Sequence, residues 1–597
     1  AGETVADVFD ALAPAEEARL ITEVGGAPGR YSFSHALVQA TLAEELGTNR
    51  RIRLHRAAGL ALEATADPSV GALAYHFGEC AVMGETERAV RYARSAAEEA
   101  LALAAPADAA TFVSRALQAV ELAGGGDRER APLLLLLATA QDAVTDPAAV
   151  DTCAAAFDAA VASGDHDLAA EAAVAYAGPS AFLFDERGER QLRRALDLLD
   201  PGDSELRAHV LARLGKVLAL DPGDEAVRMA RESFAMAGRV GSARAQRHAA
   251  SSIALTMRHR DRHAQLEFAE LALTRREGPF ALEDFEQYSL AVEALLSLGD
   301  PGGVPPVVER LRREFARSSI AALVGARALS RSILAQIEIT LAFIAGRFDL
   351  ADEVVAGLHD DPLGPEYLLG PITENFGRCQ VAWLRGDWPA SSHWWQATKD
   401  VVPGAFDVYF GYLGSGRPLP EVREYWDEWQ SVDHTRPAIT RASNVSMVAE
   451  ALRRLGEGEA SAAYAEEFAP HSGCYITNTV AYFHGPYDTA FGILSTTAGK
   501  LDRAVAFLER GVAQCDAIGS PSFGSVARLE LATTLRLRGH GDDDNRAEAL
   551  CDEVHRTTEA LGMTGWTQRV ERLAAGDLEP WRLAGDGDGD ASTEPTA

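Results

Sequence analysis

Residues 499–508 read Gly499-Lys-Leu-Asp-Arg-Ala504-Val-Ala-Phe-Leu508, and they give the clearest indication of the fold. Glycine readily ends a helix in the left-handed conformation, which residues with a Cβ resist. Ala504 is small enough for the second helix to lie close against the first. Gly492, seven positions before Gly499, places another small residue on the first helix. The stretch therefore predicts two closely packed helices joined by a glycine turn.

The same spacing, a glycine followed five residues later by Ala or Ser, recurs along the chain. It occurs at Gly84/Ala89, Gly164/Ala169, Gly346/Ala351, Gly386/Ser391 and Gly456/Ser461. Between such turns, apolar residues recur at three- and four-residue intervals, as in amphipathic helices. Each hairpin leaves an apolar face that the next hairpin covers, so the units are expected to stack. An irregular helical domain without repeats is the alternative.

Composition agrees with a helical protein. The chain has 597 residues, of which 47% are hydrophobic and 7% aromatic, and Ala and Leu dominate the apolar set. By length alone this corresponds to about four domains, a number that stacked repeats would reduce. The six cysteines form no CxxC pair, which indicates reduced, buried thiols. We see no alternating strand pattern beyond Tyr31–Phe33.

The net charge limits the partners. With 56 basic and 88 acidic residues, the formal charge is −32. Such a surface repels phosphate backbones, so we expect no direct nucleic-acid contact and no binding to anionic membranes. We find no apolar run long enough to span a bilayer and no leader-like opening, and we predict a cytoplasmic protein.

The turn stretch resembles the tetratricopeptide repeat. Gly492, Gly499, Ala504 and Leu508 match its small and large positions, but the aromatic residue expected at Ser495 is absent. The spacing between turns is 40 residues from Gly346 to Gly386 and 43 from Gly456 to Gly499. The resemblance implies an all-α fold, a tetratricopeptide-like α–α superhelix (solenoid) with degenerate repeats.

The N-terminal region has a different pattern. Helical stretches are expected near residues 5–12, 16–23 and 35–46, with a glycine-rich turn at 25–29 and a short strand at Tyr31–Phe33. This order is typical of the second half of a winged-helix domain. The chain begins without Met, and we expect it to be part of a longer protein.

A second resemblance involves this region. Tyr31-Ser-Phe33-Ser-His35-Ala-Leu37-Val38, followed by Arg50-Arg-Ile-Arg-Leu-His55-Arg-Ala, resembles the junction between winged helix and helical repeats in STAND-type signalling ATPases. These include bacterial LuxR-type large regulators, AfsR-like regulators and class III cyclase-linked proteins. Residues 501–563 are also similar to their final repeats.

This resemblance implies a role for His35, whose counterpart in the wider family faces the nucleotide phosphates. The neighbouring family Asp is replaced by Ala36, so the match is partial. The alternative is that His35 caps or packs its helix. No cofactor is expected in this chain itself, and ATP or ADP would bind only with an N-terminal module absent from it.

The sequence offers no catalytic constellation. It contains no Gly-x-x-x-x-Gly-Lys-Ser/Thr loop and no Gly-x-Ser-x-Gly elbow. His259 and His263 have the four-residue spacing of helical metal ligands, but their arginine-rich surroundings disfavour a cation. Asp586, Asp588 and Asp590 lack the final Glu of a calcium loop. We therefore predict a protein that is not an enzyme and holds no metal.

Tryptophans provide the best candidate for a partner surface. Adjacent Trp394 and Trp395 cannot both face the core of one helix, because neighbouring side chains point about 100° apart. Tryptophans that fill gaps between irregular repeats are the alternative. The candidate partner-binding residues are Trp388, Trp394, Trp395, Trp426 and Trp429.

Together these patterns predict a division of the chain and a function. The leading hypothesis is a non-catalytic repeat arm of a STAND-type ATPase regulator, transcriptional or cyclase-linked. It would bind a protein or small-molecule ligand on its repeat surface and control its own ATPase core. A stand-alone tetratricopeptide-type scaffold for peptide segments is the alternative. The predicted regions are a partial winged-helix segment (1–48), a repeat array (49–361), an irregular Trp-rich connector (362–432), C-terminal repeats (433–577) and a disordered acidic tail (578–597).

Overall fold

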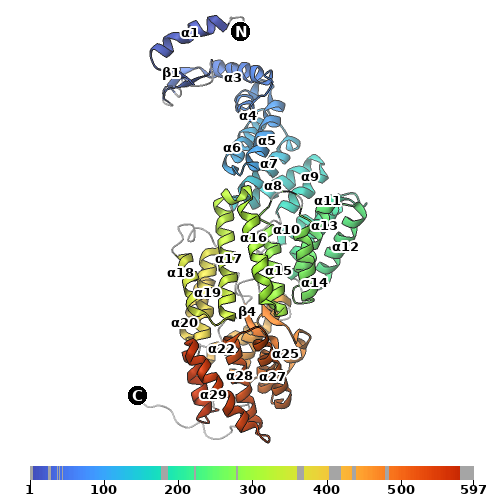
Figure 1. Ribbon diagram of the computed structural model, residues 1–597. Helices are drawn as coiled ribbons and strands as arrows, with labels where there is room; N and C mark the ends of the chain where they lie inside the picture. Colours follow the sequence, from blue (N-terminus) through green and yellow to red (C-terminus); the bar gives the residue numbers. More distant parts are fainter. Residues whose placement is uncertain are drawn as a thin grey trace. The chain divides into compact units, whose positions relative to one another are not determined.

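A computed structural model describes most of the chain (Figure 1). The described residues are 5–24, 29–35, 38, 41–42, 45–144, 146–176, 186–220, 223–276, 278, 280–359, 369–401, 418–432, 438–477 and 483–578. The chain forms two compact units, one of residues 1–142 and 147–165 and the other of residues 143–146 and 166–597. The predicted boundaries near 48, 361 and 432 concern finer divisions and stay predictions.

The N-terminal unit is mainly helical. It contains α1 (Val5–Glu17), β1 (Ile21–Glu23), β2 (Tyr31–Phe33), α3 (Thr48–Glu63), α4 (Val70–Glu79), η1 (Ala81–Met83), α5 (Thr86–Ala102), α6 (Pro106–Leu122), α7 (Asp127–Asp142) and α8 (Ala148–Ser163). The core of its helical hairpins is rich in alanine. Alanine brings neighbouring helices into close contact at little cost in side-chain entropy.

The first elements of this unit correct one expectation. The strand at Tyr31–Phe33 is confirmed, and it pairs antiparallel with β1, so Ile21 lies opposite Phe33. The helix predicted over 16–23 is wrong, because α1 ends at Glu17 and the chain then enters β1. Ile21 is the only buried side chain among those of residues 6–35 whose burial the structure describes. The assignment of this segment to a winged helix stays a prediction.

The C-terminal unit is a series of helices. They are α9 (His166–Tyr176), α10 (Glu186–Leu198), α11 (Glu205–Val217), η3 (Leu218–Leu220), α12 (Glu225–Val240), α13 (Ala243–Thr256), α14 (Arg262–Thr274), α15 (Asp284–Leu298), η4 (Pro301–Gly303), α16 (Val304–Ala316), η5 (Ser319–Ala322), α17 (Val324–Ile344), α18 (Phe348–His359), α19 (Leu369–Arg385), α20 (Trp388–Val401), α22 (Leu419–Val432), α23 (Ala438–Ser443), α24 (Val445–Leu455), α25 (Gly458–Glu467), η7 (Ala469–His471), α26 (Tyr487–Thr497), α27 (Leu501–Ala517), α28 (Pro521–Arg538), α29 (Asp543–Leu561) and α30 (Thr564–Ala574).

The turn spacing seen in the sequence is confirmed at every position. The six glycines have φ between +69° and +84°, in the left-handed region: Gly84, Gly164, Gly346, Gly386, Gly456 and Gly499. The six small residues five positions later are all 0% exposed: Ala89, Ala169, Ala351, Ser391, Ser461 and Ala504. Space for any side chain is also lacking at Gly492, where a Cβ would lie 2.3 Å from Leu508 Cγ. The fold is therefore an all-α, tetratricopeptide-like stack of helical hairpins.

Polar contacts between neighbouring hairpins reveal the repeat length. Pairs such as Arg538–Asp502 and Arg385–Asp349 join residues 36 apart, and Arg503–Glu466 joins residues 37 apart. Contacts between equivalent positions of successive hairpins recur once per repeat. The local period is therefore near 36 residues, shorter than the 40 and 43 residues between two pairs of sequence turns.

One β-hairpin in this unit was missed by the sequence analysis. Strand β3 (Tyr475–Thr477) pairs antiparallel with β4 (Phe483–Pro486), with an irregular register. All seven strand residues are buried. A strand buried on both faces lacks the alternation of polar and apolar residues by which strands are recognised in a sequence.

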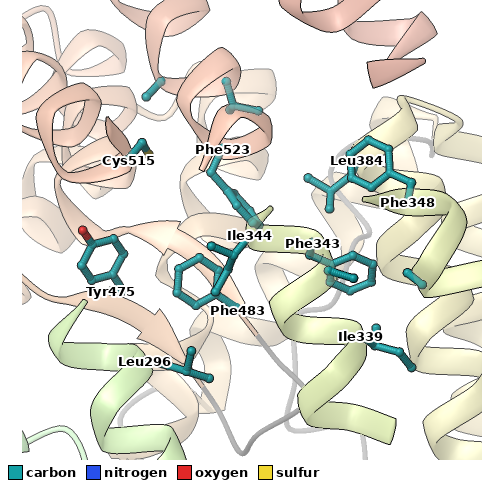
Figure 2. Close-up of a cluster of buried hydrophobic side chains, with 14 of the residues drawn as sticks. Leu296, Ile339, Phe343, Ile344, Phe348, Leu384, Tyr475, Phe483, Cys515 and Phe523 are labelled. Carbon is teal, nitrogen blue, oxygen red and sulfur yellow. The ribbon is translucent and has the colours of Figure 1, made fainter. Parts of the chain in front are cut away.

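A continuous core joins segments about 180 residues apart within the C-terminal unit. Ser522 Oγ donates to the Phe343 carbonyl at 2.7 Å, linking α28 to α17. Trp566 Nε1 donates to the Trp383 carbonyl at 3.1 Å, linking α30 to α19. Figure 2 shows Ile344 beside Phe483 and Phe523, whose rings lie 5.2 Å apart. We call the contact of α15, α17 and α19 with β3, α28 and α30 the seam.

At the seam, the turn glycines that follow α15, α17 and α19 lie directly against β3, α29 and α30. A Cβ on Gly299 would meet Tyr475 at 2.5 Å, and one on Gly346 would meet Leu561 at 3.0 Å. A Cβ on Gly386 would meet the Cα of Gly565 at 2.5 Å. These glycines therefore turn the chain and also let the two sets of hairpins approach.

Two further predictions concern the termini and the thiols. The acidic tail lies almost entirely outside the described residues, which end at Leu578. The six cysteines form no disulfide; Cys474 is half-buried and the other five are buried.

Candidate functional site

The tryptophans proposed as a partner surface are divided between two places in the structure. Trp395, Trp426 and Trp429 are at most 2% exposed, and Trp429 Nε1 donates to the Tyr464 hydroxyl at 2.7 Å. Because these three rings fill the core around α24 and α26, they do not form an accessible surface. This corrects their assignment as surface residues, and gap filling was the better interpretation.

Trp394 and Trp388 are both half-buried. The Arg378 guanidinium lies 4.9 Å from the centre of the Trp394 ring. The rest of this ring is partly open to solvent. Trp388 instead lies at the seam, 5.0 Å from Trp566, with the Arg569 guanidinium 4.6 Å from its ring centre. A partner role for these two residues stays a prediction.

A small cavity opens beside the seam tryptophans. Its volume is about 40 Å³, room for two or three water molecules, and its lining includes Trp383, Glu450, His484, Glu530 and Trp566. Burial lowers the pKa of His484 to about 3. Both glutamates pair with Arg453, which lies 2.9 Å from Glu530. Burial opposes the charge on Glu450, yet Arg453 and Arg569 outweigh it and lower its pKa to about 2.

The residues around this cavity are better suited to stabilising the seam than to binding a ligand. Its carboxylates are already matched by arginines, and the volume excludes anything larger than a few waters. Its aromatic residues come from α19, β4, α28 and α30, so their contacts stabilise the seam.

The histidines named from the sequence lie apart from one another. His35 is exposed, and its carbonyl accepts from the Val38 N–H at 3.0 Å. His259 is buried with φ +63° in the loop before α14, where its Nδ1 lies 2.7 Å from Arg262 Nη2. His263 is exposed on α14. The two imidazoles therefore do not share a helical face, because His259 lies before the start of α14.

The strongest candidate for a binding site is a polar face shared by α11, α13 and α15. These are the first helices of successive hairpins, and α11 contacts α13, which contacts α15. Each contributes charged or imidazole side chains. They are His209, Arg213 and Lys216 from α11, Arg244, Arg247 and His248 from α13, and Glu283, Asp284 and Glu286 at the start of α15.

Ion pairs across the polar face cross from helix to helix. Arg247 lies 2.9 Å from Glu283 and 2.6 Å from Asp284, with both partners on the next hairpin. Lys216 pairs with Glu286, which lies two hairpins away. Burial disfavours the charge on Glu283, but the cations around it, Arg247 first, lower its pKa overall. Ion pairs between successive hairpins therefore stabilise the polar face, and few of its charged side chains are unpaired.

A stacked pair of histidines lies among these ion pairs. The His209 and His248 rings are 3.9 Å apart and nearly parallel, at 17°. Burial lowers the pKa of His248 to about 2 and that of His209 well below its usual range, with nearby Arg213 and Arg244 adding to both shifts. Both rings are therefore neutral at physiological pH, and each carries one N–H that can donate.

Sequence analysis missed this face because charged residues are common along the chain. One available signal was the spacing of Arg247 and Asp284, which are 37 residues apart, one repeat. A search for opposite charges one repeat apart on successive first helices would have found the pair.

The described residues offer little else for chemistry. No group of three or more His, Cys, Asp or Glu among them is placed to hold a metal ion. None of the described helices combines the length and the apolar character needed to cross a bilayer.

Comparison with known proteins gives no family. No protein-family description matches the chain, and no characterised protein sequence does so. A structure described as the APC/C hetero-tetramer Cut9–Hcn1 is similar with 12% identity and a TM-score of 0.40, covering 82% of this chain and 92% of that one. A circular tandem repeat protein has 14% identity and a TM-score of 0.15, covering 89% and 96%. The fold assignment rests on the hairpins themselves.

Proposed function

We propose that this chain is a non-catalytic interaction arm of a STAND-type signalling ATPase regulator, transcriptional or cyclase-linked. The arm binds a protein or small-molecule ligand on its repeat surface and controls the ATPase core. The observation that carries this proposal is the polar face of α11, α13 and α15. Side chains from three successive hairpins meet at this face. A change in the spacing between the hairpins would therefore change how well these side chains fit a ligand.

The N-terminal segment supports the second half of the proposal. Phe9 is 44% exposed, Phe33 42% and Leu54 50%. Large apolar side chains that are exposed on α1, β2 and α3 are typical of a surface that another module covers. They belong to, or adjoin, the stretch that resembles the STAND junction.

The nucleotide belongs to the other module in this proposal. ATP or ADP would bind to the ATPase core, and the exposed His35 is accessible to a phosphate held there. A neutral or protonated imidazole donates a hydrogen bond to a phosphate oxygen. The net charge of −32 supports an arm that does not itself contact nucleic acid.

Two experiments test this division of labour. Reading the coding sequence upstream of Ala1 should reveal a nucleotide-binding module in the same frame, with a Gly-x-x-x-x-Gly-Lys-Ser/Thr loop. A stop codon directly upstream would contradict the proposal. Titration of ATP into the present chain by calorimetry should give no heat of binding, whereas micromolar affinity would place the nucleotide in the arm itself.

A further inference from the structure

The cations of the polar face are unequally matched. Lys216 pairs with Glu286, and Arg247 pairs with both Glu283 and Asp284. Arg213 lies near enough to Glu283 to help lower the pKa of that carboxyl, but neither Arg213 nor Arg244 has a carboxylate within ion-pair distance among the residues that the structure describes. The chain has 88 acidic residues for 56 basic ones, so an arginine without an acidic partner is not explained by a shortage of carboxylates.

Two buried polar atoms of this cluster also lack hydrogen-bond partners. Arg213 Nε and His209 Nε2 are shielded from solvent and make no hydrogen bond to any described residue, and Nε2 of the neutral His209 ring can donate when it carries the proton. A buried hydrogen-bonding group without a partner is unfavourable, so such groups are rare in folded proteins. Together with the exposed Arg244 on the neighbouring helix, these groups can bind an acceptor that is not among the described residues.

An oxyanion has the chemistry to satisfy these groups. Carboxylate and phosphate oxygens accept paired hydrogen bonds from the planar guanidinium fork. Arg213 and Arg244 both lie close enough to the imidazoles of His209 and His248 to disfavour their protonation. One anion placed between the two arginines is therefore also near the stacked rings.

We propose that Arg213, Arg244 and His209 form a binding site for an oxyanion, a carboxylate or a phosphate, carried by the ligand of this arm. The site rests on the proposed function, since it names the chemistry recognised on the same polar face. The ion pairs of Lys216 and Arg247 link α11 and α13 to α15, and Arg213 and Arg244 take no part in them.

Calorimetric titration of the full chain tests the site, with two probes at constant ionic strength. One probe is inorganic phosphate, and the other is acetyl-Gly-Glu-Gly-amide, with its Gln counterpart as the blank. The site predicts saturable binding of at least one probe, and the stronger probe identifies the source of the oxyanion. Arg213→Gln and Arg244→Gln should each weaken binding about tenfold, the effect of one charged hydrogen bond.

Arg231→Gln is the matched control, because Arg231 is exposed on α12 and makes no ion pair with a described residue. It should leave the affinity unchanged. The site would be overturned if neither probe binds at a concentration of 10 mM, which is about ten times a dissociation constant of 1 mM. Equal binding by all three variants would overturn it too. Either result leaves the proposed function standing if an ATPase module is encoded upstream, and the lack of that module does not remove an oxyanion site that binds.

Discussion

The turns at Gly386 and Gly499 have the same sequence pattern but lie in different surroundings. Both glycines are left-handed, and both are followed five residues later by a fully buried small residue. A Cβ on Gly499 would meet nothing within 4 Å, whereas one on Gly386 would meet the Gly565 backbone at 2.5 Å. The turn at Gly499 only reverses the direction of the chain, whereas the turn at Gly386 also forms part of the seam.

The difference shows that a local sequence pattern determines the hairpin itself. It does not determine which distant part of the chain packs against that hairpin. Gly84 and Gly164 are like Gly499, with open space at the Cβ position. Gly299 and Gly346 are like Gly386, since each faces a side chain of the other set of hairpins. The seam thus uses successive turns of one region as its contact surface.

The largest effect that sharpens this comparison is expected from Trp566→Ala. Trp566 is 3% exposed, and its indole bonds to the Trp383 carbonyl across the seam. Loss of a buried tryptophan costs about 3–5 kcal/mol. Trp394→Ala is the control, because Trp394 is half-buried away from the seam, and it should cost less than half as much. Urea unfolding measures both; equal losses would contradict the special role of the seam.

Acid should weaken the seam in a defined pH range. The pKa of His484 is about 3 in the fold and near 6.5 when unfolded, so above pH 6.5 both states are neutral and stability is at its full value. As pH falls below 6.5, the unfolded state binds a proton that the folded state refuses. At pH 5 this loss amounts to about 2 kcal/mol.

His484→Gln isolates that contribution. The variant should lose less stability than the parent between pH 7 and pH 5, measured by urea unfolding at each pH. Other buried histidines, such as His209 and His248, contribute equally to parent and variant. A parent and a variant with the same pH dependence would show that His484 is protonated in the fold.

The smallest effect is expected in the N-terminal segment. Phe9 is 44% exposed, so Phe9→Ser should change the unfolding free energy by within about 0.5 kcal/mol. Phe77→Ser in the same unit is the control, because Phe77 is 0% exposed and its loss should cost several kcal/mol. A large loss for Phe9→Ser in thermal unfolding would mean that this segment is already covered by a partner, such as a second copy.

The sequence alone predicts the hairpins well, and the reason is local. A left-handed glycine and a small residue five positions later involve one turn only, so both were visible at Gly84/Ala89 and at Gly499/Ala504. The strand β2, Tyr31–Phe33, was also found from its local composition. The helix over 16–23 failed because the residues that follow Glu17 pair with a strand rather than with their own turn.

The seam and the polar face were not predictable in the same way. Gly386 and Gly565 meet although they are 179 positions apart, and nothing in either local stretch indicates the other. The prediction for Trp395, Trp426 and Trp429 failed for a related reason, because the helices that bury these three rings are not visible in the local sequence. Trp394 is half-buried and Trp395 is buried, as expected of neighbours on one helix.

The most direct test compares Gly386→Ala with Gly499→Ala by urea unfolding. Both variants bear the cost of a Cβ at positive φ, about 1–2 kcal/mol. Gly386→Ala adds the clash with the Gly565 backbone, and we expect it to lose about 1–3 kcal/mol more than Gly499→Ala. Equal losses in the two variants would contradict the claim that the repeat turns of one region build the seam with the other.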